Sequence, residues 1–248
     1  MPATAPVALI TGAAHRLGAQ TAKTLHQRGW NLVVHYRSRE QQARELVEGL
    51  NRERPGSAYA VQADLSLTGD VNRLASEAIT PWDRLDALVN NASVFYANPT
   101  EAATGEDWNT VLHTNLRAPF FLLQACLPAL RENGGSVVNM IDIYSERPLA
   151  NHPLYCASKA GLAALTHSWA KDLAPDVRVN GVSPGAILWP EGNGEMDKSQ
   201  QQSILDKTPL ARTGNPDDIA GTIAFLICDA PFITGQIVAV DGGRSLNM

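Results

Sequence analysis

The segment Val7-Ala-Leu-Ile-Thr11-Gly-Ala-Ala-His-Arg-Leu-Gly18 decides the fold of this chain. Its first half is an apolar run that Gly12 ends, which is typical of a buried strand in a parallel sheet. A helical pattern follows over Arg16–Arg28, and Gly29 closes that helix. Gly12 permits a tight turn, and Gly18 lets the helix pack close to the sheet. Because the turn N–H groups and the positive helix end face the same space, the segment predicts a pyrophosphate site.

The rest of the chain repeats this alternation of strand and helix. Six further apolar runs are expected as strands: Asn31–His35, Ala58–Gln62, Asp86–Asn90, Ser136–Met140, Val177–Val182 and Gln236–Val240. The longest helical patterns between them cover Trp108–Arg131 and Pro153–Leu173. Ser38 can cap a helix that runs to Arg52. Seven strands with intervening helices predict an α/β fold with a doubly wound, seven-stranded parallel sheet, the Rossmann fold.

Composition and charge narrow the class of protein. The chain has 248 residues, 44% of them hydrophobic, and a formal net charge of -5, which argues against nucleic-acid binding. Cys126, Cys156 and Cys228 lack metal-ligand spacing, so free thiols and no metal site are expected. Without a leader or a long apolar run, we expect a cytoplasmic protein with no membrane contact. One domain over 1–248 is expected, with a substrate-covering loop, or a plain surface loop, over 188–202.

The end of the second expected strand carries basic residues. His35-Tyr-Arg-Ser-Arg39 has no acidic residue of the kind that accepts bonds from the ribose hydroxyls of NAD. Arg37, Ser38 and Arg39 offer guanidinium and hydroxyl donors to a 2'-phosphate, which favours NADPH. A solvated loop with a basic helix start is the alternative interpretation. Asp64 could accept a bond from the adenine amino group or could cap the next helix.

A tyrosine and a lysine lie four residues apart in Tyr155-Cys-Ala-Ser-Lys159, hence on one face of a predicted helix. The ammonium group of Lys159 is expected to lower the pKa of the Tyr155 phenol and make it a proton relay. Such a pair on an arbitrary helix would be a surface pair. Its place beyond a nucleotide motif favours catalysis.

The chain resembles the short-chain dehydrogenase/reductase family from Thr11 to Gly243. The further marks are Asn90-Asn-Ala92, Asn115, Ser183-Pro-Gly185 and Val240-Asp-Gly-Gly243. The resemblance implies hydride transfer from a nicotinamide and an Asn115 that orients a water in the proton relay. It also implies that Pro184 and Gly185 flank the nicotinamide and that long helices pack across a two-fold axis in a homotetramer.

Three positions depart from the common family pattern. Asp142 replaces the usual serine thirteen residues before the tyrosine, Arg16 replaces the middle glycine, and Phe95 adds an aromatic ring. A carboxylate would repel a developing alkoxide, whereas it suits a nitrogen heterocycle whose C=N bond needs a proton. In the alternative, Asp142 points away and Ser145 or solvent does the work of the serine. Phe95 could stack on a flat ring or simply pack the loop.

These departures resemble the pteridine reductase branch of the family. That branch implies that Arg16 and Ser93 contact pterin and cofactor phosphate, that Phe95 stacks on the pterin, and that Asp142 and Tyr155 handle protons. Trp189 could wall the pterin pocket or anchor its loop. The implied substrate residues are Arg16, Ser93, Phe95, Asp142, Tyr155 and Trp189. The implied catalytic residues are Asp142, Tyr155, Lys159 and Asn115.

The same resemblance and motifs predict the residues that hold NADPH. They are Gly12, His15, Arg16, Leu17, Gly18, His35, Tyr36, Arg37, Ser38, Asp64, Leu65, Asn91, Ala92, Ser93, Tyr155, Lys159, Pro184 and Gly185. His35 and Ser38 would lie by the 2'-phosphate. The function expected is reduction of a pterin or folate by NADPH. Two alternatives stay open: a carbonyl or ketoacyl reductase of the same fold, and a non-catalytic NADPH sensor.

Overall fold

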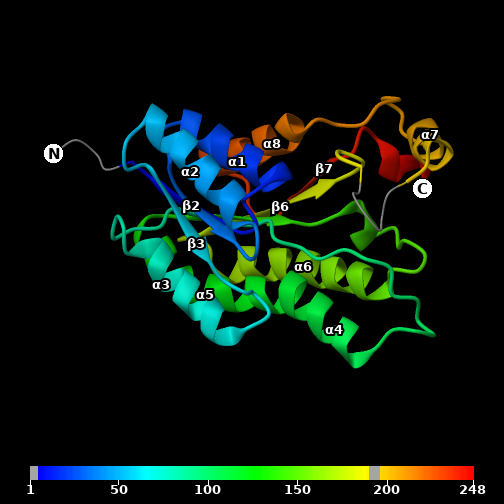
Figure 1. Cartoon of the computed structure of the whole chain (residues 1–248), viewed down its shortest axis with the longest axis horizontal. Helices are drawn as coiled ribbons and strands as arrows, with labels where there is room; N and C mark the ends of the chain where they lie inside the picture. Colours follow the sequence, from blue (N-terminus) through cyan, green and yellow to red (C-terminus); the bar gives the residue numbers. More distant parts are fainter. Residues whose placement is uncertain (1–4, 190–195) are drawn as a thin grey trace.

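The computed structural model describes residues 5–189 and 196–248, which build one α/β unit around a single sheet (Figure 1). The strands are β1 Val7–Ile10, β2 Asn31–Tyr36, β3 Ala58–Gln62, β4 Ala87–Asn90, β5 Ser136–Met140, β6 Arg178–Pro184 and β7 Ile237–Val240. The α-helices are α1 Arg16–Gln27, α2 Glu40–Glu53, α3 Thr68–Ile79, α4 Gly105–Leu112, α5 Ala118–Glu132, α6 Pro153–Asp172, α7 Lys198–Asp206 and α8 Pro216–Cys228. The described part also holds a π-helix, η1 His113–Arg117, and two 3-10 turns, η2 Ile143–Ser145 and η4 Arg244–Asn247.

The sheet has seven strands in the order β3-β2-β1-β4-β5-β6-β7, and every neighbouring pair is parallel. This confirms the doubly wound fold expected from the sequence, with strand ends within two residues of the predicted ones. The order reverses between β1 and β4. Ligands of such sheets bind at the carboxyl ends of the strands beside that reversal.

Both faces of the sheet are covered, and each carries a hydrophobic core. Val7 and Leu9 of β1 point into one core, while Ala8 and Ile10 point into the other. Figure 1 shows α1, α2 and α8 on the second face and α3, α5 and α6 on the first. A strand buried on both faces has no polar alternation, which is why its sequence is a continuous apolar run.

Three expectations about local structure were wrong or incomplete. Arg39, without a side-chain hydrogen bond, is the N-cap of α2, so Ser38 does not cap that helix. Asp64 accepts bonds from the N–H and hydroxyl of Ser66 before α3, whose N-cap is Leu67. The expected loop over 188–202 ends inside α7, because Asp197 and Gln200 form a capping box at the start of that helix. Part of that loop, 190–195, lies outside the described residues.

Two further findings concern the cysteines and the apolar character of the helices. Each of the three cysteines, all in the described part, is a free thiol. Within the described ranges, no helix has the length and apolarity to cross a membrane.

Candidate active site

The turn between β1 and α1 is shaped by two glycines. Gly12 has φ +62°, a conformation that side chains other than glycine rarely adopt. A Cβ on Gly18 would lie 2.5 Å from the Gly12 carbonyl oxygen, closer than atoms can approach. Asn91, which follows β4, locks this approach by donating from Nδ2 to the carbonyls of Thr11 and Gly12 at 2.8 and 3.1 Å. The turn is therefore fixed against the sheet at the strand reversal.

Arg16 occupies the family's middle-glycine position and keeps the backbone conformation of a glycine. Its φ is +52°, a conformation that strains an arginine. The guanidinium donates to the carbonyl oxygens of Leu188 and Trp189, both at 3.1 Å. Arg16 thus links the turn after β1 to the segment after β6. Trp189 takes part in this contact through its backbone carbonyl oxygen.

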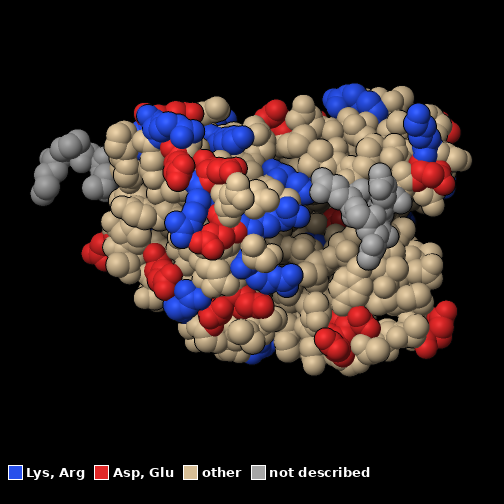
Figure 2. All heavy atoms as spheres, in the orientation of Figure 1, with Lys and Arg blue, Asp and Glu red and all other residues tan. Residues whose placement is uncertain are grey.

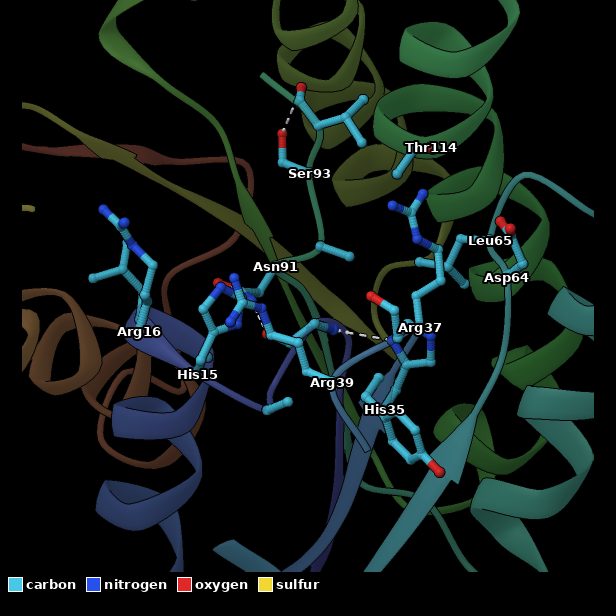
Figure 3. Close-up of a pocket in the computed structure, with 18 residues that line it drawn as sticks. His15, Arg16, His35, Arg37, Arg39, Asp64, Leu65, Asn91, Ser93 and Thr114 are labelled. Atoms are coloured by element: carbon cyan, nitrogen blue, oxygen red, sulfur yellow. Dashed lines mark hydrogen bonds between the residues drawn. The ribbon is translucent and has the colours of Figure 1, made fainter. Parts of the chain in front are cut away.

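His35, at the end of β2, supports the same turn from below (Figure 3). The N–H of Gly12 donates to its Nδ1 at 3.0 Å, and its Nε2 donates to the Ala63 carbonyl at 3.1 Å. Burial lowers the pKa of the imidazole from 6.5 to about 4, so the ring is neutral at pH 7. Because both ring nitrogens are engaged inside the protein, His35 positions the turn and adds no positive charge for a 2'-phosphate.

A cavity of about 490 Å³ opens above this turn. Every residue from Gly12 to Ser93 that the sequence assigned to the cofactor lines it, together with Arg39 and Thr114. In Figure 3 the side chains of Arg37 and Arg39 lie beside His35, and Figure 2 shows basic side chains gathered around a hollow in this face. The close approach of Gly18 to Gly12, which a Cβ would prevent, and the basic residues around the cavity fit a dinucleotide cofactor.

A second cavity of about 190 Å³ continues the first and shares Arg16, Leu17, Asn91 and Ser93 with it. It is lined by the remaining predicted residues of the cofactor site, which are Tyr155, Lys159, Pro184 and Gly185, and by Asp142. A Cβ on Gly185 would lie 2.7 Å from the Cα of Asp241, so the backbone there approaches the residue that follows β7 as closely as glycine allows.

Asp142 and Tyr155 form a hydrogen-bonded pair in this second cavity. The Tyr155 hydroxyl donates to Asp142 Oδ2 at 2.7 Å, and the Tyr144 N–H donates to Asp142 Oδ1 at 2.9 Å. The carboxyl therefore faces Tyr155, and the alternative in which it points away is wrong. Lys159 Nζ donates to the Met140 carbonyl at 2.8 Å and lies 5.7 Å from the centroid of the Tyr155 ring.

Burial shifts all three titratable groups toward their neutral forms. It raises the pKa of Asp142, although bonds to that carboxyl and nearby positive charges oppose the shift. Burial, with the charge and hydrogen bond of Asp142, raises the pKa of Tyr155 well above its ordinary value. Burial lowers the pKa of Lys159 to about 8. The expectation of a lowered Tyr155 pKa is therefore wrong for this structure, first because the phenol is buried and second because the Asp142 carboxyl group is hydrogen-bonded to it.

Asn115 lies in η1, the π-helical turn between α4 and α5. Its Oδ1 accepts from the Val94 N–H at 2.8 Å, and its Nδ2 donates to the Val94 carbonyl and to Ser158 Oγ at 3.0 and 3.1 Å. The amide thereby holds the loop after β4 against α6. These contacts position the loop, and the role in a water relay stays a prediction.

Phe95, next in that loop, lies beside Tyr155. Its ring centroid is 4.7 Å from that of Tyr155 in an edge-on arrangement and 4.7 Å from that of His152 in a stacked one. Phe95 is 42% exposed, so part of it is accessible to a ligand. Ser93, two residues earlier, lines both cavities.

Two residues near Asp142 were not predicted from the sequence. Tyr144 supplies the N–H that holds Asp142, and Arg244 Nη2 donates to the Tyr144 hydroxyl at 3.0 Å. The only available sequence signal was Arg244 in the Asp-Gly-Gly-Arg tail, and its partner lies 100 residues away. No cluster of His, Cys, Asp and Glu in the described residues could hold a metal ion.

Comparisons with known proteins agree with this geometry. The family model described as enoyl-(acyl carrier protein) reductase matches residues 12–245. Pteridine reductase 1 of Leishmania tarentolae is 35% identical over 98% of this chain and 97% of its own length. The 3-oxoacyl-[acyl-carrier-protein] reductase FabG of Staphylococcus aureus is 34% identical over 95% and 96%, and an uncharacterized oxidoreductase of Methylorubrum extorquens is 36% identical over 96% of both chains. The chain is therefore an oxidoreductase of the short-chain dehydrogenase/reductase family, whose members use NAD(H) or NADP(H).

Proposed function

We propose that this protein reduces a C=N bond of a pterin, giving the tetrahydro form, with NADPH as the reductant. The observation that carries the proposal is the 2.7 Å bond from the Tyr155 hydroxyl to Asp142. Ketone reduction requires a donor aimed at a developing alkoxide, yet here the phenol proton is directed to a carboxylate. A ring nitrogen in place of the ketone oxygen can engage a carboxyl group through its own N–H and amino donors.

The residues of the second cavity would have separate roles in proton transfer and in orienting the substrate. When bound there, a reduced nicotinamide supplies the hydride. The Tyr155 hydroxyl oxygen and Asp142 Oδ2 lie 2.7 Å apart and share a proton in a hydrogen bond. The raised pKa values of both groups favour keeping that proton at neutral pH until a ring nitrogen accepts it. Phe95 and Ser93 would orient the flat ring from the loop that Asn115 fixes, so part of the rate would come from positioning.

The preference for NADPH is supported by the rim of the first cavity. Arg37, Ser38 and Arg39 line it where β2 ends, and no carboxylate of β2 stands there to bond the ribose hydroxyls. His35, by contrast, is occupied with Gly12 and Ala63. The phosphate is therefore assigned to the two arginines and the serine.

A homotetramer in the cytoplasm is also inferred from the family resemblance. Phe120 of α5 is 38% exposed and its ring centroid lies 5.9 Å from that of Trp169 of α6. Trp169 is itself buried, so the exposed ring of Phe120 on α5 is the one that suits a helix-to-helix contact between subunits. Light scattering after size exclusion measures the assembly directly.

A substrate panel tests the proposal against its rivals. Oxidation of NADPH and NADH is followed with dihydrobiopterin, dihydrofolate, a 3-ketoacyl thioester and an enoyl thioester. We expect the highest kcat/KM with NADPH and a dihydropterin, by about 100-fold over the thioesters. A preference for the ketoacyl thioester would make the protein a carbonyl reductase, as its FabG relatives are named. Stoichiometric NADPH binding without any turnover would make it a sensor.

A further inference from the structure

Arg244 is a buried charge whose place in the fold is beside the catalytic pair. It begins η4, after β7, and only 9% of its surface is exposed. Its guanidinium donates to the Tyr144 hydroxyl at 3.0 Å and lies 5.6 Å from the centroid of that ring. Its Nε is buried without a hydrogen-bond partner among the described residues. Burying an arginine with an unsatisfied donor costs free energy of folding, so a function of this side chain in the site is expected.

The contacts of Arg244 lead to the catalytic tyrosine in three steps. Arg244 holds the Tyr144 side chain, the Tyr144 N–H donates to Asp142 Oδ1 at 2.9 Å, and Asp142 Oδ2 accepts from the Tyr155 hydroxyl at 2.7 Å. Tyr144 belongs to η2, directly after Asp142, so fixing its side chain also fixes the turn that aims the carboxyl group.

We propose that Arg244 is a positioning residue for the Asp142–Tyr155 pair. It anchors the η2 turn through Tyr144, and its positive charge favours the ionised carboxylate that receives the Tyr155 hydroxyl. The inference rests on the proposed function only in assigning Asp142 to proton transfer. It holds for a pterin or a carbonyl substrate alike.

The charged and titratable groups around Asp142 come from several elements. Tyr155 and Lys159 face it from α6, Tyr144 from η2 and Arg244 from η4. Arg16 lines the same cavity. Cys156 contributes to raising the pKa of Tyr144 and of Tyr155. Burial raises the pKa of Asp142, whereas the charges of Lys159 and Arg244 lower it. Because Lys159 also holds the Met140 carbonyl, Arg244 is the charge that can be removed with less disturbance of α6.

The test compares Arg244→Met with Arg244→Lys and the control Arg212→Met. Arg212 is an arginine whose side chain is 60% exposed, paired with Asp218, so its loss changes net charge equally. The titration of Asp142 is followed by infrared difference spectroscopy, with its band assigned by loss in Asp142→Asn. The pH profile of kcat/KM is recorded on whichever substrate class the wild type turns over.

The expected result is an Asp142 titration that moves up by about one pH unit in Arg244→Met, because an attractive charge is lost. Arg244→Lys should move it by less than half as much, and Arg212→Met should leave it in place. An unmoved titration in Arg244→Met, or equal movement in the Met and Lys variants, would overturn the proposal. If Arg244→Met does not fold, Tyr144→Phe, which removes the bonded hydroxyl, must shift the titration in the same direction.

Failure of the proposed function has a different signature. If the wild-type protein reduces a ketoacyl thioester and does not turn over pterins, pterin reduction is refuted. The Arg244 test is unaffected by that result. The infrared titration needs no turnover at all, so it decides the role of Arg244 even if the protein proves to be a sensor.

Discussion

The turn after β1 and the pocket around Asp142 line two adjoining cavities and are built by different means. The turn relies on a fixed backbone: two glycines allow its close approach, the Asn91 amide holds its carbonyl oxygens, and the neutral His35 holds the Gly12 N–H. The pocket around Asp142 relies on titratable side chains whose pKa values are shifted by burial. Phosphate binding needs only fixed geometry, whereas proton transfer needs a controlled environment. Mutations should therefore act on cofactor affinity and stability in the first region and on rate and pH dependence in the second.

The sharpest division is expected from Tyr155→Phe. Loss of the hydroxyl that donates to Asp142 should lower kcat about 10³-fold, the range of general acid catalysis. NADPH affinity should stay within about twofold, because the phosphate-binding turn is untouched. Steady-state kinetics and fluorescence titration of NADPH measure the two quantities. Full activity in this variant would remove Tyr155 from the chemistry.

Asp142→Ser tests whether the carboxyl decides the substrate. We expect pterin turnover to fall about 100-fold, with any ketone reduction unchanged or improved, because serine can donate to a carbonyl. Asp142→Asn, which keeps the shape without the charge, is the matched control. An equal loss of both activities would mean that Asp142 only supports the structure.

His35→Asn probes the backbone-built region through pH. The folded state holds His35 neutral with a pKa of about 4, whereas the unfolded chain has an ordinary value near 6.5. The unfolded state therefore binds more protons between these values, and stability should fall by about 3 kcal/mol as pH drops through that window. Asparagine can still accept from Gly12 but cannot titrate, so this part of the slope should vanish.

Urea unfolding at several pH values measures the slope. His167→Asn, at an exposed histidine, is the control and should keep it. A wild-type slope that survives in His35→Asn would assign the pH dependence to other groups.

Arg37→Ala should weaken NADPH far more than NADH. Removal of one charge-assisted contact to the 2'-phosphate is expected to raise KM for NADPH about tenfold and leave NADH unchanged. Arg44→Ala, which removes an exposed arginine paired with Glu40 on α2, serves as control. Equal effects on both cofactors would place Arg37 away from the 2'-phosphate.

The smallest effect is expected where the two regions meet. Arg16→Gly relieves the strained φ of +52° and should stabilise the fold by about 1 kcal/mol. It also removes the bonds to Leu188 and Trp189, so KM for the pterin should rise severalfold. Thermal unfolding and substrate kinetics, taken together, show whether the strain serves the site. A variant unchanged in both stability and KM would mean that Arg16 contributes to neither.

The sequence predicted the backbone-built region well and the titrating region only in outline. Apolar runs and glycine spacing are local signals, so the seven parallel strands could be predicted from them. The residues that line the first cavity were named from sequence motifs together with the family resemblance. The pairing of Asp142 with Tyr155 followed from family spacing. The direction of the Tyr155 pKa did not, because it depends on burial and on which charge is nearest. The Arg244–Tyr144 contact joins residues 100 positions apart, and no periodicity indicates it.

The π-helical turn His113–Arg117 has a consequence for how this chain can change length. Each residue advances an α-helix by about 100°, so a wider turn resets the angular phase between α4 and α5. Deleting one residue there would restore a regular helix and keep its backbone hydrogen bonds. It would also rotate α4 by about a quarter turn relative to α5 and carry Asn115 off Val94. We expect this position to tolerate substitution better than deletion, since the extra residue keeps the two helices in register with the active site.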